Sequence, residues 1–177
     1  MFIVAAAFVS LSLVPSTMRQ DEAKPLVTRN QAKLNLAGAE LVLQGAQARA
    51  KELKLAVNVA VVDDGGHLVA FARMDGARPA SVYTALTKAT AAATYRQATG
   101  PSPAGAAQPD ILLNLSLQNA AAVSGGKMTS LKGGVPILVD GKVVGAVGVG
   151  GGTGEQDLEV AKAGIALFED ALGKGRE

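Results

Sequence analysis

The residue of this chain best suited to chemistry is its single histidine, His67. It follows the turn 63–66, so the carboxylates of Asp63 and Asp64 lie close to the imidazole in sequence. A neutral imidazole is a strong nitrogen ligand for an iron porphyrin. With one His and no Cys, however, a structural zinc site is excluded. An exposed polar residue at a turn is the simpler interpretation, and no G-x-S-x-G pattern supports a Ser-His-Asp hydrolase.

A second group of polar residues surrounds the loop DGARP, residues 75–79. Guanidinium groups near a helix start can hold a carboxylate or a haem propionate, whereas a local ion pair between Asp75 and an arginine explains the same residues without a ligand. Both interpretations are open. Ser81 and Lys88 share one stripe of the following helix with Thr84 and Tyr95, and amphipathicity favours a solvated face for that stripe. The candidate ligand-binding residues are His67, Arg73, Asp75, Arg78, Ser81 and Lys88, with His67 also the candidate metal ligand.

The glycine-rich run after residue 147 resembles a phosphate-binding loop only superficially. Gly148 and Gly150 would need a glycine at position 153, which is Thr153, and no G-x-x-x-x-G-K-[ST] pattern occurs. Glu155 and Asp157 also place negative charge at the start of the next helix, which disfavours phosphate. We therefore expect these glycines to let the last strand meet the final helix at close range.

The elements that must position these residues are read from periodicity and turn signals. Thr28–Gln31 and Thr153–Gln156 match the capping box that opens a helix, and Asp140-Gly141 between two β-branched runs indicates a tight hairpin. A first hairpin turns at 63–66. We expect helices over 30–53, 81–97, 110–122 and from 153 onward, and strands over 57–62, 67–74, 128–131, 135–139 and 142–149. This order predicts an α/β (α+β) domain with a mainly antiparallel five-stranded sheet flanked by helices.

Composition narrows the classes of function. The net charge is +2 and 3% of residues are aromatic, so the chain has neither the basic footprint nor the stacking residues typical of nucleic-acid binding. The absence of cysteine excludes disulfides, thiolate metal sites and cysteine nucleophiles. With 177 residues, 49% of them hydrophobic and none Trp, we expect one domain with a core of Ala, Val and Leu.

An apolar run, MFIVAAAFVSLSLV, occupies residues 1–14. It is too short to span a bilayer and has the length of the apolar region of a signal peptide, but it lacks a basic segment before it and a small-x-small cleavage site after it. We expect a signal peptide or a disordered terminus over residues 1–25 and the domain over 26–177. A signal peptide would make the protein secreted or periplasmic; otherwise it would be cytoplasmic.

Two long motifs in this order resemble the GlcG/HbpS-like family of haem-binding or haem-degrading proteins, a type also found as the C-terminal domain of PduO proteins. The first is VVDDGGHLVAFARMDGARPAS with KATAA behind it, within residues 61–92. The second is GGVPILVDGKVVGAVGVGGGTGEQD followed by VAKAG, within residues 133–164. The resemblance covers residues 30–172. It implies a profilin-like single domain and a homo-oligomer, from dimer to octamer.

The resemblance implies two alternative functions. The first is binding of haem or another tetrapyrrole, with weak haem degradation or iron handling. Side-chain chemistry, rather than the resemblance, then makes His67 or a Thr hydroxyl the axial candidate and Arg73 or Lys88 the partner of the propionates. The second is a small-acid-binding accessory or structural oligomer of the glycolate-utilisation (GlcG) type without catalysis, in which Arg73, Arg78 and Lys88 meet the acid. The family has no universal catalytic residue, so enzymatic activity stays an open question.

Overall fold

The computed structural model describes residues 27–103 and 106–175. Residues 32–177 form one compact unit, and residues 1–31 are a second unit. The elements are α1 (Leu36–Glu52), β1 (Asn58–Asp63), β2 (Leu68–Arg73), α2 (Ser81–Tyr95), α3 (Ile111–Val123), β3 (Gly134–Val139), β4 (Lys142–Gly150) and α4 (Gly154–Lys174). The strands form an antiparallel sheet in the order β2-β1-β4-β3. The predicted α/β architecture is confirmed.

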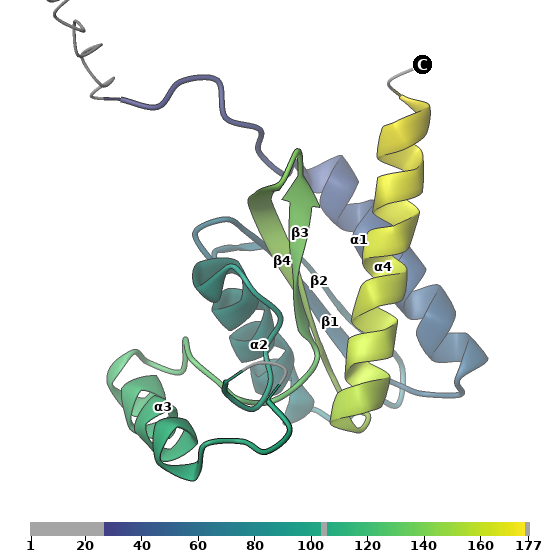
Figure 1. The fold of residues 1–177 in the computed structure, drawn as a ribbon. Coiled ribbons are helices and arrows are strands. Elements are labelled where there is room, and N and C mark those ends of the chain that lie inside the picture. The colour runs from purple at the N-terminus through teal and green to yellow at the C-terminus, as the bar shows by residue number, and fades with distance from the viewer. Residues whose placement is uncertain (1–26, 104–105, 176–177) are drawn as a thin grey trace, which may run out of the picture. The chain divides into compact units, whose positions relative to one another are not determined.

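The sheet lies between two layers of helices (Figure 1). Helices α1 and α4 pack on each other and on one face, and α2 covers the opposite face. Helix α3 stands away from the sheet and buries none of its residues. The sheet therefore has a thick core on the α1–α4 side and a thin one under α2.

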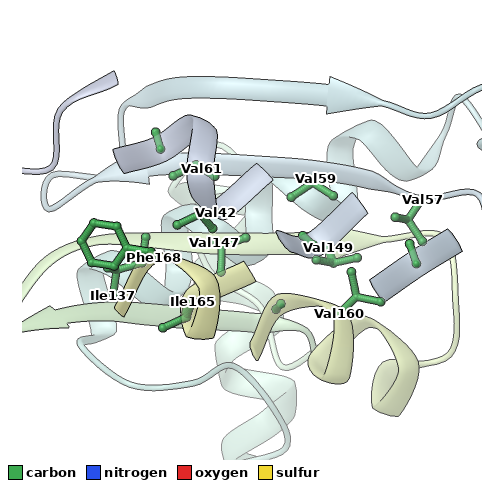
Figure 2. Packing of buried hydrophobic residues seen from close by; sticks show 14 of the residues in the cluster. Val42, Val57, Val59, Val61, Ile137, Val147, Val149, Val160, Ile165 and Phe168 are labelled. Atoms are coloured by element: carbon green, nitrogen blue, oxygen red, sulfur yellow. The ribbon is translucent and has the colours of Figure 1, made fainter. Parts of the chain in front are cut away.

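Alternation along the strands decides which helix meets which face, because successive side chains point to opposite sides. Val57, directly before β1, and Val59 and Val61 on β1 lie in the core with α1 and α4, as Figure 2 shows. Ala60 and Val62 pack instead against the alanines of α2. The α2 side is built almost entirely from small side chains, which brings that helix close to the sheet.

Glycines on β4 make this close approach possible. A Cβ on Gly148 would lie 2.2 Å from the Ala85 carbonyl oxygen and 2.3 Å from the Ala89 nitrogen. A Cβ on Gly150 would lie 2.4 Å from Thr84 Oγ1. The expectation that these glycines make room for the final helix is therefore wrong for these two positions: the helix that they admit is α2.

The first helix begins later than its sequence indicates. The predicted cap at Thr28 is wrong, because Asn30 has a φ of +57°, which an α-helix cannot contain, and the helix starts at Leu36. Asn35 caps it instead, its side chain accepting a hydrogen bond from the Gly38 amide at 2.9 Å.

The predicted strand over 128–131 is also wrong, so the sheet has four strands among the described residues rather than five. This segment runs outside the sheet and reaches β3 through Gly133, whose φ of +114° turns the chain. Its side chains are thereby free to line cavities.

The remaining local signals are confirmed. Asp140 and Gly141 both have positive φ, +50° and +72°, as a primed hairpin turn requires. At α4 the Thr153 side chain accepts from the Gln156 amide while the Gln156 side chain accepts from the Thr153 amide, which completes the capping box. The predicted signal sequence lies outside the described residues. No helix among those described is long and apolar enough to cross a membrane.

Substitution of Gly148 tests the contact between β4 and α2. We expect Gly148→Ala to lower the free energy of unfolding by about 3 kcal/mol or more, because the atoms that the new methyl group meets are backbone atoms. Gly173→Ala is the matched control, since a Cβ there meets nothing within 4 Å and alanine stabilises a helix by about 0.5–1 kcal/mol. Urea unfolding measures both, and equal losses would contradict the packing described.

Candidate functional site

A cavity of about 210 Å³ opens where the C-terminal end of β4 meets the starts of α2 and α4. Its walls come from three stretches of the chain: the loop before α2 together with α2, the segment before β3, and the turn after β4 together with the start of α4. Side chains of both charges and bare glycine backbone line it. The lining residues are Arg78, Thr84, Lys88, Leu131, Lys132, Gly151, Gly152, Gly154 and Asp157.

A buried ion pair forms the floor of this cavity. Lys88 Nζ lies 2.6 Å from Asp157 Oδ2 and 2.8 Å from the Val149 carbonyl oxygen, and the two charged side chains are 5% and 3% exposed. Asp157 Oδ1 accepts a further hydrogen bond from the Gly152 amide at 2.9 Å. The pair joins α2 on one face of the sheet to α4 on the other, so it fixes both helices relative to the end of β4.

Glycines provide the space that the ion pair occupies. A Cβ on Gly133 would lie 2.6 Å from Asp157 Cβ and 3.1 Å from Lys88 Nζ. A Cβ on Gly134 would lie 2.3 Å from the Lys88 carbonyl oxygen. A side chain at position 133 would displace the pair, and one at position 134 would displace the backbone of α2 that carries Lys88.

Arg78 is held at the rim by the start of α2 and by β1. Its Nε donates to Ser81 Oγ at 2.9 Å. The buried Asn58 donates from Nδ2 to the Arg78 carbonyl oxygen at 3.1 Å, and its Oδ1 has no hydrogen-bond partner among the described residues. Lys132 stands on the opposite wall and is paired with Glu155. Two lysine–carboxylate pairs and one further guanidinium therefore surround the cavity.

The structure divides the predicted site residues among three places. Arg78, Ser81 and Lys88 meet at the cavity just described. Arg73 and Asp75 line a separate hollow of about 340 Å³ next to α1. The described residues contain no ion pair between Asp75 and either arginine. The predicted solvated stripe on α2 is wrong at its two key positions, since Ser81 and Lys88 are buried.

His67 lies at the β1–β2 turn and lines none of these cavities. Its side chain is 83% exposed, with Nδ1 3.3 Å from Asp63 Oδ1. Burial pushes the pKa of Asp63 up, but the amides of His67 and Gly65, each 2.9 Å from Oδ1, stabilise the charged form and bring the pKa below its usual value. Asp63 therefore shapes the turn, and the His67 ring projects from it.

A third hollow, of about 260 Å³, lies behind α3. Met128, Thr129 and Leu131 line it together with Gln118 and Ala121. Leu131 lines the cavity at Arg78 as well, so the two hollows adjoin. A thioether and a threonine hydroxyl thus lie close to the cationic cavity.

Sequence reasoning missed Lys132, Thr84 and Asp157 as partners in one cavity. It took Glu155 and Asp157 as negative charge against an anion, whereas each is paired with a lysine from elsewhere in the chain. One local signal could have indicated the pair: Lys88 interrupts the alanine-rich face of α2. A lysine buried on such a face needs a partner of opposite charge.

Comparisons with known proteins agree on one family. The family described as "Haem degrading protein HbpS-like" matches residues 34–166. The chain belongs to the HbpS-like family. It is 40% identical over 111 residues to the protein GlcG of Escherichia coli K12, covering 63% of this chain and 76% of GlcG.

Two solved structures support the assignment. The crystal structure of Klebsiella pneumoniae protein ORFY superposes with a TM-score of 0.68 at 28% identity, covering 82% of this chain and 98% of ORFY. A crystal structure of a PduOC:heme complex superposes with a TM-score of 0.62 at 25% identity, covering 77% of this chain and 95% of that one. The predicted GlcG/HbpS-like membership is confirmed.

A double-mutant cycle on Lys88 and Asp157 tests the ion pair. We expect Lys88→Met to lower the free energy of unfolding by about 3–5 kcal/mol, because it leaves a buried carboxylate without a counter-charge. Lys88→Met combined with Asp157→Asn removes both charges and should cost less than the sum of the single variants. Additive losses in urea unfolding would show that the two groups do not interact.

Proposed function

We propose that this protein binds haem or a related tetrapyrrole. The family description and the haem-bound relative support the proposal. The structural observation that carries it is the exposed imidazole of His67, which projects from the β1–β2 turn with Nδ1 next to Asp63 and most of its side chain accessible. When bound, haem would supply an iron centre with redox and ligand-binding chemistry.

The residues present fit a haem held at the surface rather than one enclosed by a single chain. The three cavities described measure about 210–340 Å³, below or at the lower end of the range of pockets that enclose drug-sized ligands. His67 can coordinate iron from an open face, and the residues described include no cluster of three His, Asp or Glu side chains that could hold a bare metal ion. Arg73, which is exposed at its hollow, remains the proposed partner for a propionate, whereas Lys88 is buried in its pair with Asp157 and does not suit a haem at the surface.

Haemin titration tests this proposal. We expect a Soret shift that His67→Ala weakens or abolishes, because it removes the only imidazole of the chain. Lys142→Ala, an exposed position at the other hairpin, is the control and should leave the shift unchanged. Slow loss of the Soret band with release of iron would extend the proposal to haem breakdown.

Two outcomes would change the assignment. The absence of any Soret shift would count against haem binding. A shift that His67→Ala leaves intact but Met128→Leu or Thr129→Val removes would transfer the axial ligand to the hollow behind α3.

A second candidate function is favoured by the cavity at Arg78. A volume of about 210 Å³ and a cationic rim suit a small carboxylic acid, the ligand class expected for an accessory protein of the GlcG type. Binding of such an acid to the folded state would raise the midpoint of thermal unfolding with ligand concentration.

We also propose that copies of this chain associate through α3. The helix carries no charged residue, and Ile111, Leu112 and Val123 are 73%, 77% and 92% exposed. Contiguous apolar surface of this kind marks interaction sites in soluble proteins. A second copy presents the same uncharged helix, so burial of α3 against its equivalent involves no charge repulsion.

Light scattering coupled to size-exclusion chromatography tests the role of α3. We expect the protein to elute as an oligomer and Leu112→Glu to reduce its mass, because burial of a carboxylate in an apolar contact is costly. Tyr83→Glu makes a similar change at a 75% exposed position of α2 and should leave the mass unchanged. An oligomer that tolerates Leu112→Glu would exclude α3 as the interface.

A further inference from the structure

The charges around the cavity leave one guanidinium available to a ligand. Lys88 is paired with Asp157 and Lys132 with Glu155. Arg78 donates through Nε to Ser81 Oγ, and no described carboxylate pairs with it. Its two terminal nitrogens are therefore free to bind a carboxylate in the bidentate geometry that guanidinium groups favour.

The start of α4 reinforces this preference for an anion. The first N–H groups of a helix lack intrahelical acceptors and carry partial positive charge. Gly154, the first residue of α4, lines the cavity, and so do Gly151 and Gly152 just before it. The Gly152 amide is already bonded to Asp157 Oδ1, so the amides of the first turn of α4 are the ones that a ligand in the cavity would meet.

Lys88 provides a second, buried contact point. An ammonium group has three N–H donors, and the Val149 carbonyl and Asp157 carboxylate accept two of them. The third has no acceptor among the described residues, although Lys88 is only 5% exposed and lines the cavity. A buried donor without a partner is costly, so an acceptor oxygen on a ligand would be favoured at this position.

Size and charge then restrict the ligand. Three cations face two carboxylates, a net charge of +1 that matches a monoanion better than a phosphate dianion. The volume of about 210 Å³ admits a molecule of only a few carbons.

From these observations we propose that the cavity binds a small monocarboxylate with a hydroxyl or carbonyl oxygen on its α-carbon. Arg78 and the start of α4 hold the carboxylate, and the third N–H of Lys88 donates to the second oxygen. The proposal deepens the small-acid function and rests on it.

A series of matched acids tests the two-point contact. Lactate, pyruvate and propionate have equal carbon number and charge, and only the first two carry the second oxygen. Isothermal titration should give an affinity for lactate or pyruvate at least about tenfold higher than for propionate. Propionate lacks the oxygen that would accept the hydrogen bond from the charged Lys88. Inorganic phosphate should bind no more tightly than propionate, and tighter phosphate binding would overturn the ligand class.

Variants locate the binding. Arg78→Gln should weaken lactate or pyruvate binding by about tenfold or more. Lys162→Gln removes one positive charge from the exposed side of α4 and should leave the affinity unchanged. Both positions are exposed, so folding is preserved and can be verified by the midpoint of thermal unfolding. Equal losses in the two variants would overturn the site, because they would show a general effect of net charge.

The outcomes separate this proposal from the function on which it rests. Equal affinity for all three acids, with dependence on Arg78, would overturn the contact at Lys88 while the small-acid function stands. No binding of any acid by the folded protein would overturn both.

Discussion

The ion pair between Lys88 and Asp157 is the interaction on which the rest of this end of the molecule depends. Burial of two charges is tolerable only if they meet each other and fill their remaining hydrogen-bonding capacity. The Val149 carbonyl and the Gly152 amide supply part of that capacity here, and one N–H of Lys88 has no acceptor among the described residues. Because one partner comes from α2 and the other from α4, the pair ties both helical layers to the last residues of β4. Separation of either helix from the sheet would expose a charge without its partner.

The small residues of the chain follow from this constraint. For Lys88 to reach across the sheet end, α2 must lie close to β4, and Gly148 and Gly150 permit the contact. Gly133 leaves room for the pair itself, and Gly134 leaves room for the backbone of α2 at Lys88. Three further glycines, Gly151, Gly152 and Gly154, line the cavity beside the pair. The cavity therefore lies where the two helical layers are joined at the end of β4.

Haem and a small acid would use different parts of this molecule. The imidazole of His67 lies at the β1–β2 turn, whereas Arg78 lies at the cavity near the starts of α2 and α4. The hollow behind α3 adjoins that cavity through Leu131, so a ligand with both apolar and anionic parts would meet both surfaces there. Membership in the family accounts for the fold but does not say which surface binds the ligand. Variants at His67, Met128 and Arg78 each alter one of the three surfaces and so distinguish among them.

Local chemistry in the sequence was enough to predict the hairpin at Asp140-Gly141, the capping box at Thr153 and the helix that follows it. Each depends on residues within a few positions of one another, and at these places the tertiary structure agrees with the local signal, as it does not at Thr28. Membership in the family was likewise visible in two continuous motifs.

Features that depend on distant residues were decided only by the tertiary structure. The expected strand at 128–131 has no neighbour in the sheet, and α1 is capped by Asn35 and begins at Leu36 rather than at the capping box of Thr28. Lys88 and Asp157 are 69 positions apart, so no local pattern could pair them or show that Asp157 neutralises a lysine rather than repelling an anion. The sequence alone determined which side chains were available for chemistry. Their grouping was set by the close packing of α2 and α4 on the two faces of one sheet.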